Sequence, residues 1–159
     1  HSIYHLALVV ERLGDAKEAQ PLFERAHSLD PAHYPLPAEM SDEVFDGSVQ
    51  EALENLPRSI REYIDPVQVL IEDWPSRDLV LGEKVSPQIL GLFIGTPRTG
   101  TSAWHQPDDI DRVIIFKKNL EKVCRTAEDL IDQVQITVRH EVGHYLGLDE
   151  DDMERLGLA

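Results

Sequence analysis

Residues 126–147 constrain the fold more than any other stretch, because their apolar side chains recur with the period of an α-helix. Thr126, followed by Glu128 and Asp129, has the form of a helix start. One apolar sector consists of Ala127, Leu130, Ile131, Val134, Val138, Val142 and Tyr145, and Asp132, Gln135, Arg139 and Gly143 lie roughly opposite it. The stretch therefore predicts a long amphipathic helix with one face on the core.

Two histidines on this helix have the spacing of metal ligands. His140 and His144 are four residues apart, so they lie one above the other and can offer two imidazole nitrogens to one tetrahedral cation. Glu141 lies where a carboxylate can take a proton from a water in the open coordination position. With Gln133 and Thr137 these residues form a third sector at the edge of the apolar one. The pattern predicts a zinc site at the floor of a cleft, with Glu141 as the general base.

A third ligand is expected just after the helix. Gly147 is free to adopt a positive φ, which ends the helix and lets the chain double back towards the metal. The acidic run of residues 149–152 then supplies the ligand. Asp149, Glu150, Asp151 and Glu154 are the alternatives for that position.

Residues 1–31 predict a separate unit, an αα-hairpin that turns at Gly14 and stops at Pro31. It resembles one tetratricopeptide repeat, on the pattern of Leu6, Ala7, Val10, Leu13, Gly14, Ala19, Phe23, Ala26 and Pro31. A single solenoid repeat cannot bury its apolar faces alone. We therefore expect it to pack on upstream repeats, on a second chain or on the following domain; a binding surface for a protein partner is the alternative. Residues 32–40 are expected to form a linker.

Residues 41–159 are expected to form one α+β domain. Helical spacing predicts a helix that starts at Ser41 and ends before Pro57, and a short helix over residues 58–64. Strands are predicted at residues 67–72, 90–95 and 112–117, and Gly91 indicates close packing on the second. Asn119 is expected to cap a helix that runs through residue 124. Residues 73–86 show no clear pattern beyond a turn at 76–78, and residues 96–111 predict a long loop of the kind that forms lids or binding edges.

Composition limits the classes of function. Thirty acidic against fifteen basic side chains give a net charge of −15, which repels nucleic acid and anionic membranes. No apolar run approaches membrane-spanning length, and the single cysteine excludes an internal disulfide framework. The chain shows no secretory signal peptide, so a cytoplasmic location is expected. Because it begins at His1 rather than Met, we expect that upstream sequence has been removed.

The run from His140 to Glu150 resembles the zincin metallopeptidases, and in more detail the small bacterial minimal zincin family with the pattern HExxHxxGxxD/E. The likeness extends to residues 91–97, 98–104, 111–116, 119–121 and 149–157, and so covers residues 60–158. It implies a small mixed sheet packed on the motif helix, with His140 and His144 as ligands and Glu141 as the base. Glu150 stands where the metzincin pattern has its third histidine, and a carboxylate suits zinc.

The leading hypothesis is a zinc-dependent metallopeptidase with one Zn²⁺, held by His140, His144 and Glu150. Glu141 activates the attacking water, and an antiparallel strand edge aligns the peptide or protein substrate. Arg98, His105 and Tyr145 are the candidates for substrate or oxyanion contacts. The alternative is a catalytically weak or inactive zinc-binding module that recruits a partner through the helical repeat.

Overall fold

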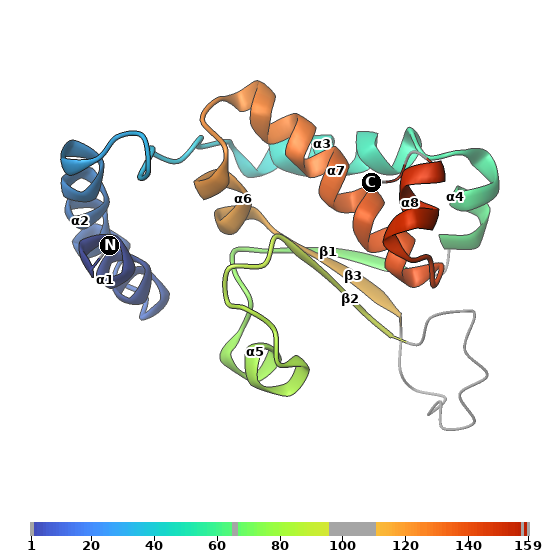
Figure 1. The fold of residues 1–159 in the computed structure, drawn as a ribbon, viewed down its shortest axis with the longest axis horizontal. Helices are drawn as coiled ribbons and strands as arrows, with labels where there is room; N and C mark the ends of the chain where they lie inside the picture. The colour runs from blue at the N-terminus through green and yellow to red at the C-terminus, as the bar shows by residue number, and fades with distance from the viewer. Residues whose placement is uncertain (1, 65–66, 96–110, 157, 159) are drawn as a thin grey trace. The chain divides into compact units, whose positions relative to one another are not determined.

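The computed structural model describes residues 2–64, 67–95, 111–156 and 158 (Figure 1). The chain separates into two compact units, His1–Ala38 and Glu39–Ala159. In the first, α1 (Ser2–Arg12) and α2 (Ala16–Leu29) pack together as a helical hairpin. Ala7, Ala19 and Ala26 are buried, and such small side chains let two helices approach closely. The predicted hairpin is confirmed.

The second unit contains the remaining helices and strands. Their order is α3 (Asp42–Glu54), α4 (Arg58–Ile64), β1 (Gln68–Glu72), α5 (Arg77–Glu83), β2 (Gly91–Ile94), β3 (Arg112–Phe116), α6 (Lys117–Val123), α7 (Ala127–Tyr145) and α8 (Glu150–Leu156). Ser41 caps α3 and Thr126 caps α7, each accepting a hydrogen bond from a backbone N–H three residues later. The α+β class predicted from the sequence is confirmed.

The three strands form a small mixed sheet in the order β1-β3-β2. β1 is parallel to β3, and β2 is antiparallel to β3, so that Leu70 and Leu92 both pair with Ile114. The central strand is buried from Val113 to Phe116. Burial on both faces explains why β3 is continuously apolar rather than alternating.

Helix α7 lies on the sheet against β2 and β3, and α3 packs against α7 (Figure 1). The apolar sector predicted for α7 is buried at Leu130, Val134, Val138, Val142 and Tyr145, whereas Ala127 is exposed at the first turn. The assignment of Gly143 to the polar face was wrong. Gly143 is buried because Met153 of α8 packs directly on it.

Two local predictions were also wrong. Asn119 lies inside α6 and does not cap it; its amide group donates to the carbonyl oxygens of Pro87 at 3.0 Å and Ile89 at 2.8 Å. It therefore holds the segment that leads into β2. Residues 76–78 begin a helix, α5, because the Ser76 hydroxyl accepts from the N–H of Leu79.

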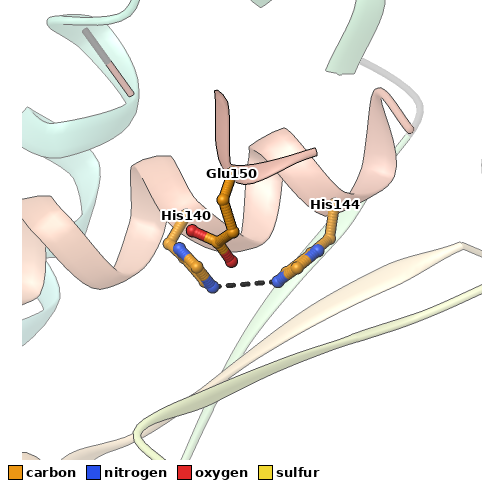
Figure 2. Close-up of side chains that lie close together, drawn as sticks. All are labelled: His140, His144 and Glu150. Carbon is orange, nitrogen blue, oxygen red and sulfur yellow. Dashed lines mark hydrogen bonds between the residues drawn. The ribbon is translucent and has the colours of Figure 1, made fainter. Parts of the chain in front are cut away.

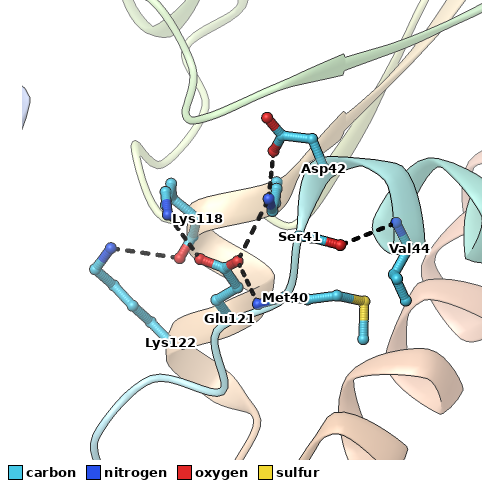
Figure 3. Close-up of polar contacts among 8 residues, drawn as sticks. Met40, Ser41, Asp42, Val44, Lys118, Glu121 and Lys122 are labelled. Atoms are coloured by element: carbon cyan, nitrogen blue, oxygen red, sulfur yellow. Dashed lines mark hydrogen bonds and ion pairs between the residues drawn. The ribbon is translucent and has the colours of Figure 1, made fainter.

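A buried charge network fixes the start of α3 to α6 (Figure 3). The Glu121 side chain accepts from the backbone N–H of Met40 at 3.2 Å and from Lys118 at 3.1 Å. Lys117, 5% exposed, lies 3.8 Å from Glu121, 2% exposed, and also pairs with Asp42. Two buried charges thus neutralise each other, and Met40 is held at the edge of the domain.

None of the helices in the described part of the chain has the length and apolar composition needed to cross a bilayer.

Candidate metal centre

The end of α7 turns the chain back on itself. Gly147 has a φ of 71°, the N–H of Gly147 donates to the carbonyl of His144, and the N–H of Leu148 donates to that of Gly143. These two bonds and the left-handed glycine form a Schellman motif. Asp149 then caps α8 by accepting from the N–H of Asp152 at 2.8 Å. The predicted helix end at Gly147 is confirmed, and the return brings Glu150 beside the histidines of α7.

Three side chains from α7 and α8 converge at this point (Figure 2). Nε2 of His140 lies 2.9 Å from Nε2 of His144, and one ligand atom from each of His140, His144 and Glu150 lies within 4.8 Å of the others. Within the described residues, this is the one group of three His, Cys, Asp or Glu side chains that meets this condition. The sequence had left four carboxylates open, and the structure brings Glu150 to the histidines.

The geometry fits a zinc ion. Zinc binds imidazole nitrogen at about 2.0–2.1 Å and carboxylate oxygen at about 2.0–2.2 Å, and a tetrahedron of that size has edges of about 3.3 Å. The two imidazole nitrogens are 2.9 Å apart and all three ligand atoms lie within 4.8 Å of one another, which is the scale of that tetrahedron. Two imidazoles and one carboxylate also leave a fourth position open, which is typical of catalytic rather than structural zinc. His140, His144 and Glu150 can therefore hold one ion.

Glu141 is oriented by the neighbouring strand. Its Oε2 accepts a hydrogen bond from the backbone N–H of Phe93 at 2.9 Å, and the residue is 7% exposed. Burial raises the pKa of this carboxyl, while the charge of His140 and the Phe93 hydrogen bond act in the opposite direction. Burial also lowers the pKa of His144, assisted by His140 and opposed by Glu150. A neutral imidazole is the form that binds a metal.

Gly91 makes the close approach between β2 and α7 possible. A Cβ atom at this position would lie 2.9 Å from both Cγ of Glu141 and Cγ2 of Thr137. Both distances are shorter than ordinary van der Waals contact. The close packing predicted from the small residue is confirmed, and its partner is Glu141 itself.

The sequence predicts that Glu141 is a general base. Replacing Gly91 with alanine is expected to displace its carboxylate and to lower the rate of any reaction that this base catalyses by about 10–100-fold, because small misplacements of a catalytic group have effects of this size. Gly82→Ala is the matched control, since nothing lies within 4 Å of the Cβ position of Gly82 in α5. Steady-state kinetics on both zinc-loaded variants tests this. Equal rates for Gly91→Ala and the wild type would show that the contact does not position Glu141.

A cavity of about 340 Å³ opens beside His140 and Glu141. Its α7 wall contains the sector that the sequence placed next to the apolar face, including Gln133 and Thr137. Ile136 completes this wall, and Ile89, Leu90 and Gly91 line the opposite side. Asn119 donates a hydrogen bond to the carbonyl of Ile89 and so holds one residue of the cavity lining in place. Its position in the sequence does not reveal this role.

Among the described residues, no strand pairs with the edge of β2 that faces away from β3, and this edge lies near Glu141. The N–H of Phe116 donates to the carbonyl of Leu90, so Leu90, Leu92 and Ile94 direct their backbone groups to β3, and the intervening Gly91 and Phe93 direct theirs outward. The outward N–H of Phe93 is the one that Glu141 occupies. Gly91, which lines the cavity, therefore directs its backbone groups away from β3.

The other residues singled out in the sequence lie elsewhere. Tyr145 is buried, with its ring 5.3 Å from that of Phe93, which places it in the core and not on the cavity surface. Arg98 and His105 lie outside the described residues. The hydrogen bond from Phe93 to Glu141 joins residues 48 positions apart, and no local signal in the sequence indicates it.

Two imidazoles and a carboxylate are a donor set found in catalytic zinc sites, and here they converge beside a buried glutamate. Residues 64–158, more than half of the chain, match the model of the zincin-like metallopeptidase family. The chain belongs to that family. A comparison with curated proteins gives no match. The family match does not include the helical hairpin, and the tetratricopeptide likeness of residues 1–31 stays a prediction.

Proposed function

We propose that the protein is a zinc-dependent peptidase in which His140, His144 and Glu150 hold one ion and Glu141 is the general base. The observation that carries the proposal is the convergence of three ligand atoms within 4.8 Å, next to a buried glutamate on a cavity wall. Membership of the zincin-like metallopeptidase family supports it. Three protein ligands leave a fourth coordination position open, which favours a catalytic role for the ion.

The metal ion and Glu141 have different roles in the proposed reaction. Zinc, when bound, supplies Lewis-acid chemistry that polarises oxygen and eases deprotonation of water. Glu141 is held through Oε2 by Phe93, which leaves Oε1 to take the proton of the attacking water and pass it to the leaving amine. Because burial raises its pKa, Glu141 is closer to the range in which one group accepts and then donates a proton at neutral pH.

The substrate is a peptide that pairs, through Gly91, with the edge of β2 that faces away from β3. Gly91 lies near Thr137 and Phe93 lies near Glu141, so β2 runs in the same direction as α7. A peptide antiparallel to β2 therefore directs its C-terminal side towards Ile136. The cavity lined by Ile89, Leu90 and Ile136 suits an aliphatic side chain on that side of the cleaved bond.

Metal removal and peptide mapping test the proposal together. The zinc-loaded protein is incubated with a mixture of peptides, and cleavage sites are identified by mass spectrometry. We expect cleavage before aliphatic residues, its loss on treatment with a chelator, and its return when zinc is restored. Cleavage that is unaffected by chelation would contradict the proposal.

The same experiment addresses the second candidate function, a zinc-binding interaction module. The helical hairpin, which lies outside the matched family region, is the observation that favours it. Stoichiometric zinc binding without cleavage of any peptide, together with unfolding on chelation, would support the module and exclude the peptidase.

A further inference from the structure

We propose that Met153 is a positioning residue for the metal ligand Glu150, acting through a notch in α7 at Gly143. The inference rests on the proposed function, because it takes Glu150 as the third ligand. Gly143 lies one residue before His144 on α7, and Met153 lies three residues after Glu150 on α8. The contact between them is therefore within one helical turn of a ligand on each helix.

The notch exists because residue 143 has no side chain. A Cβ atom at Gly143 would lie 2.3 Å from Sδ and 2.9 Å from Cγ of Met153, so the methionine occupies the volume that any other residue would fill. Gly143 is part of the buried surface of α7, and Met153 is 0% exposed. The distance between α7 and α8 is thus set by a thioether in direct contact with helix backbone.

Met153 attaches α8 to the core, together with Leu158, which is buried just beyond the end of the helix. Of the seven residues of α8, all of them described, Met153 alone is buried. A helix this short is not stable without tertiary contacts. The turn at Gly147 and the cap at Asp149 set the direction in which the chain returns. Neither of them is a side-chain contact between α8 and α7. The depth of Met153 in the notch therefore determines how closely the exposed Glu150 approaches His140 and His144.

Small changes in that approach affect metal binding. Ligands must be held to within about 0.5 Å of the productive geometry. Residues that orient metal ligands typically change metal affinity by about 10–100-fold when they are replaced. Gly143→Ala pushes the methionine outward, and Met153→Ala removes the contact. Both variants leave the three ligands chemically intact.

The test measures zinc affinity by competition with a chromophoric chelator, and the coordination of Co²⁺ by its visible absorption, in the full chain. Gly143→Ala and Met153→Ala are each expected to raise the zinc Kd by about 10–100-fold. Met153→Leu conserves volume and is expected to stay within about threefold of the wild type. Gly47→Ala is the matched glycine control, because nothing lies within 4 Å of that Cβ position in α3. Where Met153→Ala does not fold, Met153→Val takes its place, with a smaller rise in Kd expected.

The Tm of the metal-free variants separates positioning from packing. A merely structural role lowers the Tm of the metal-free protein and leaves the zinc Kd and the Co²⁺ spectrum unchanged, and that result overturns the inference. If the wild type binds zinc and the variants bind it equally well, only the role of Met153 fails. A wild-type protein that binds no zinc overturns the proposed function and this inference together.

Discussion

Replacing Glu141 with glutamine is expected to lower kcat for peptide cleavage by about 10²–10⁴-fold, the range that a general base contributes. The amide oxygen can still accept the hydrogen bond from the N–H of Phe93, which is 2.9 Å from Oε2 in the wild type. Side-chain position is therefore retained, while the neutral amide cannot take a proton from water. Steady-state kinetics of the zinc-loaded variant, on a peptide that the wild type cleaves, gives the measurement.

Zinc affinity and stability are the controls for this variant. Glu141 is not one of the three converging ligands, so the zinc Kd is expected to stay within a few-fold of the wild type. Because burial raises the pKa of Glu141, the charged carboxylate is disfavoured at this position, and the uncharged amide is expected to give an equal or higher Tm at pH 7. A Glu141→Gln variant with the wild-type kcat would remove Glu141 from the mechanism.

Replacing Glu121 with alanine is expected to lower the free energy of unfolding by about 3–5 kcal/mol, because it leaves a buried ammonium group without its closest buried counter-charge. Lys117 is 5% exposed and lies 3.8 Å from Glu121. The N–H of Met40 also loses its acceptor. Asp42 continues to pair with Lys117, but its carboxylate is exposed to solvent and replaces little of the lost interaction.

The free energy of unfolding of Glu121→Ala is measured by urea denaturation and is compared with that of Glu62→Ala. Glu62 pairs with Arg58 on the surface of α4, where the side chains are 65% and 85% exposed. Removal of that pair is expected to change stability by less than about 1 kcal/mol. If Glu121→Ala were no more destabilising than Glu62→Ala, the buried network would not fix the start of α3 to α6.

Elements with a strong period or a clear cap were predicted correctly from the sequence. Thr126 and Ser41 cap α7 and α3 as expected, and the Gly147 turn ends α7. These signals are local, since a cap is made by residues three positions apart. The apolar run at residues 112–117 likewise predicted a strand. The structure adds that this strand, β3, is central and buried, and a strand covered on both faces needs no polar alternation.

Predictions failed where a distant segment decides the environment of a residue. Gly143 appeared on the polar side of α7 because helical periodicity does not include α8, which returns to cover it with Met153. Asn119 is a good helix cap by type, but two carbonyl groups about 30 residues earlier in the chain bind its amide instead. Neither the packing of Met153 on Gly143 nor the hydrogen bonds of Asn119 can be inferred from the spacing of residues in the sequence.

Some residues of the candidate site could be predicted from local spacing, and others depend on contacts with distant segments. His140, Glu141 and His144 share one helix, so their spacing alone indicated a common site. The choice among four carboxylates needed the fold of the turn: Asp149 is used as the cap of α8, and Glu150 is the one that reaches the histidines. Phe93 and Gly91, which hold and accommodate Glu141, come from a strand about 50 residues earlier and were not identifiable as site residues.

The most direct measurement is the zinc content of the native protein, combined with X-ray absorption at the zinc edge. We expect one equivalent of zinc, bound by two imidazole nitrogens at about 2.0–2.1 Å and by carboxylate oxygen at about 2.0–2.2 Å. His144→Ala is expected to lose the ion. A native protein that binds no zinc, or that keeps one equivalent after His144→Ala, would contradict a metal centre at His140, His144 and Glu150.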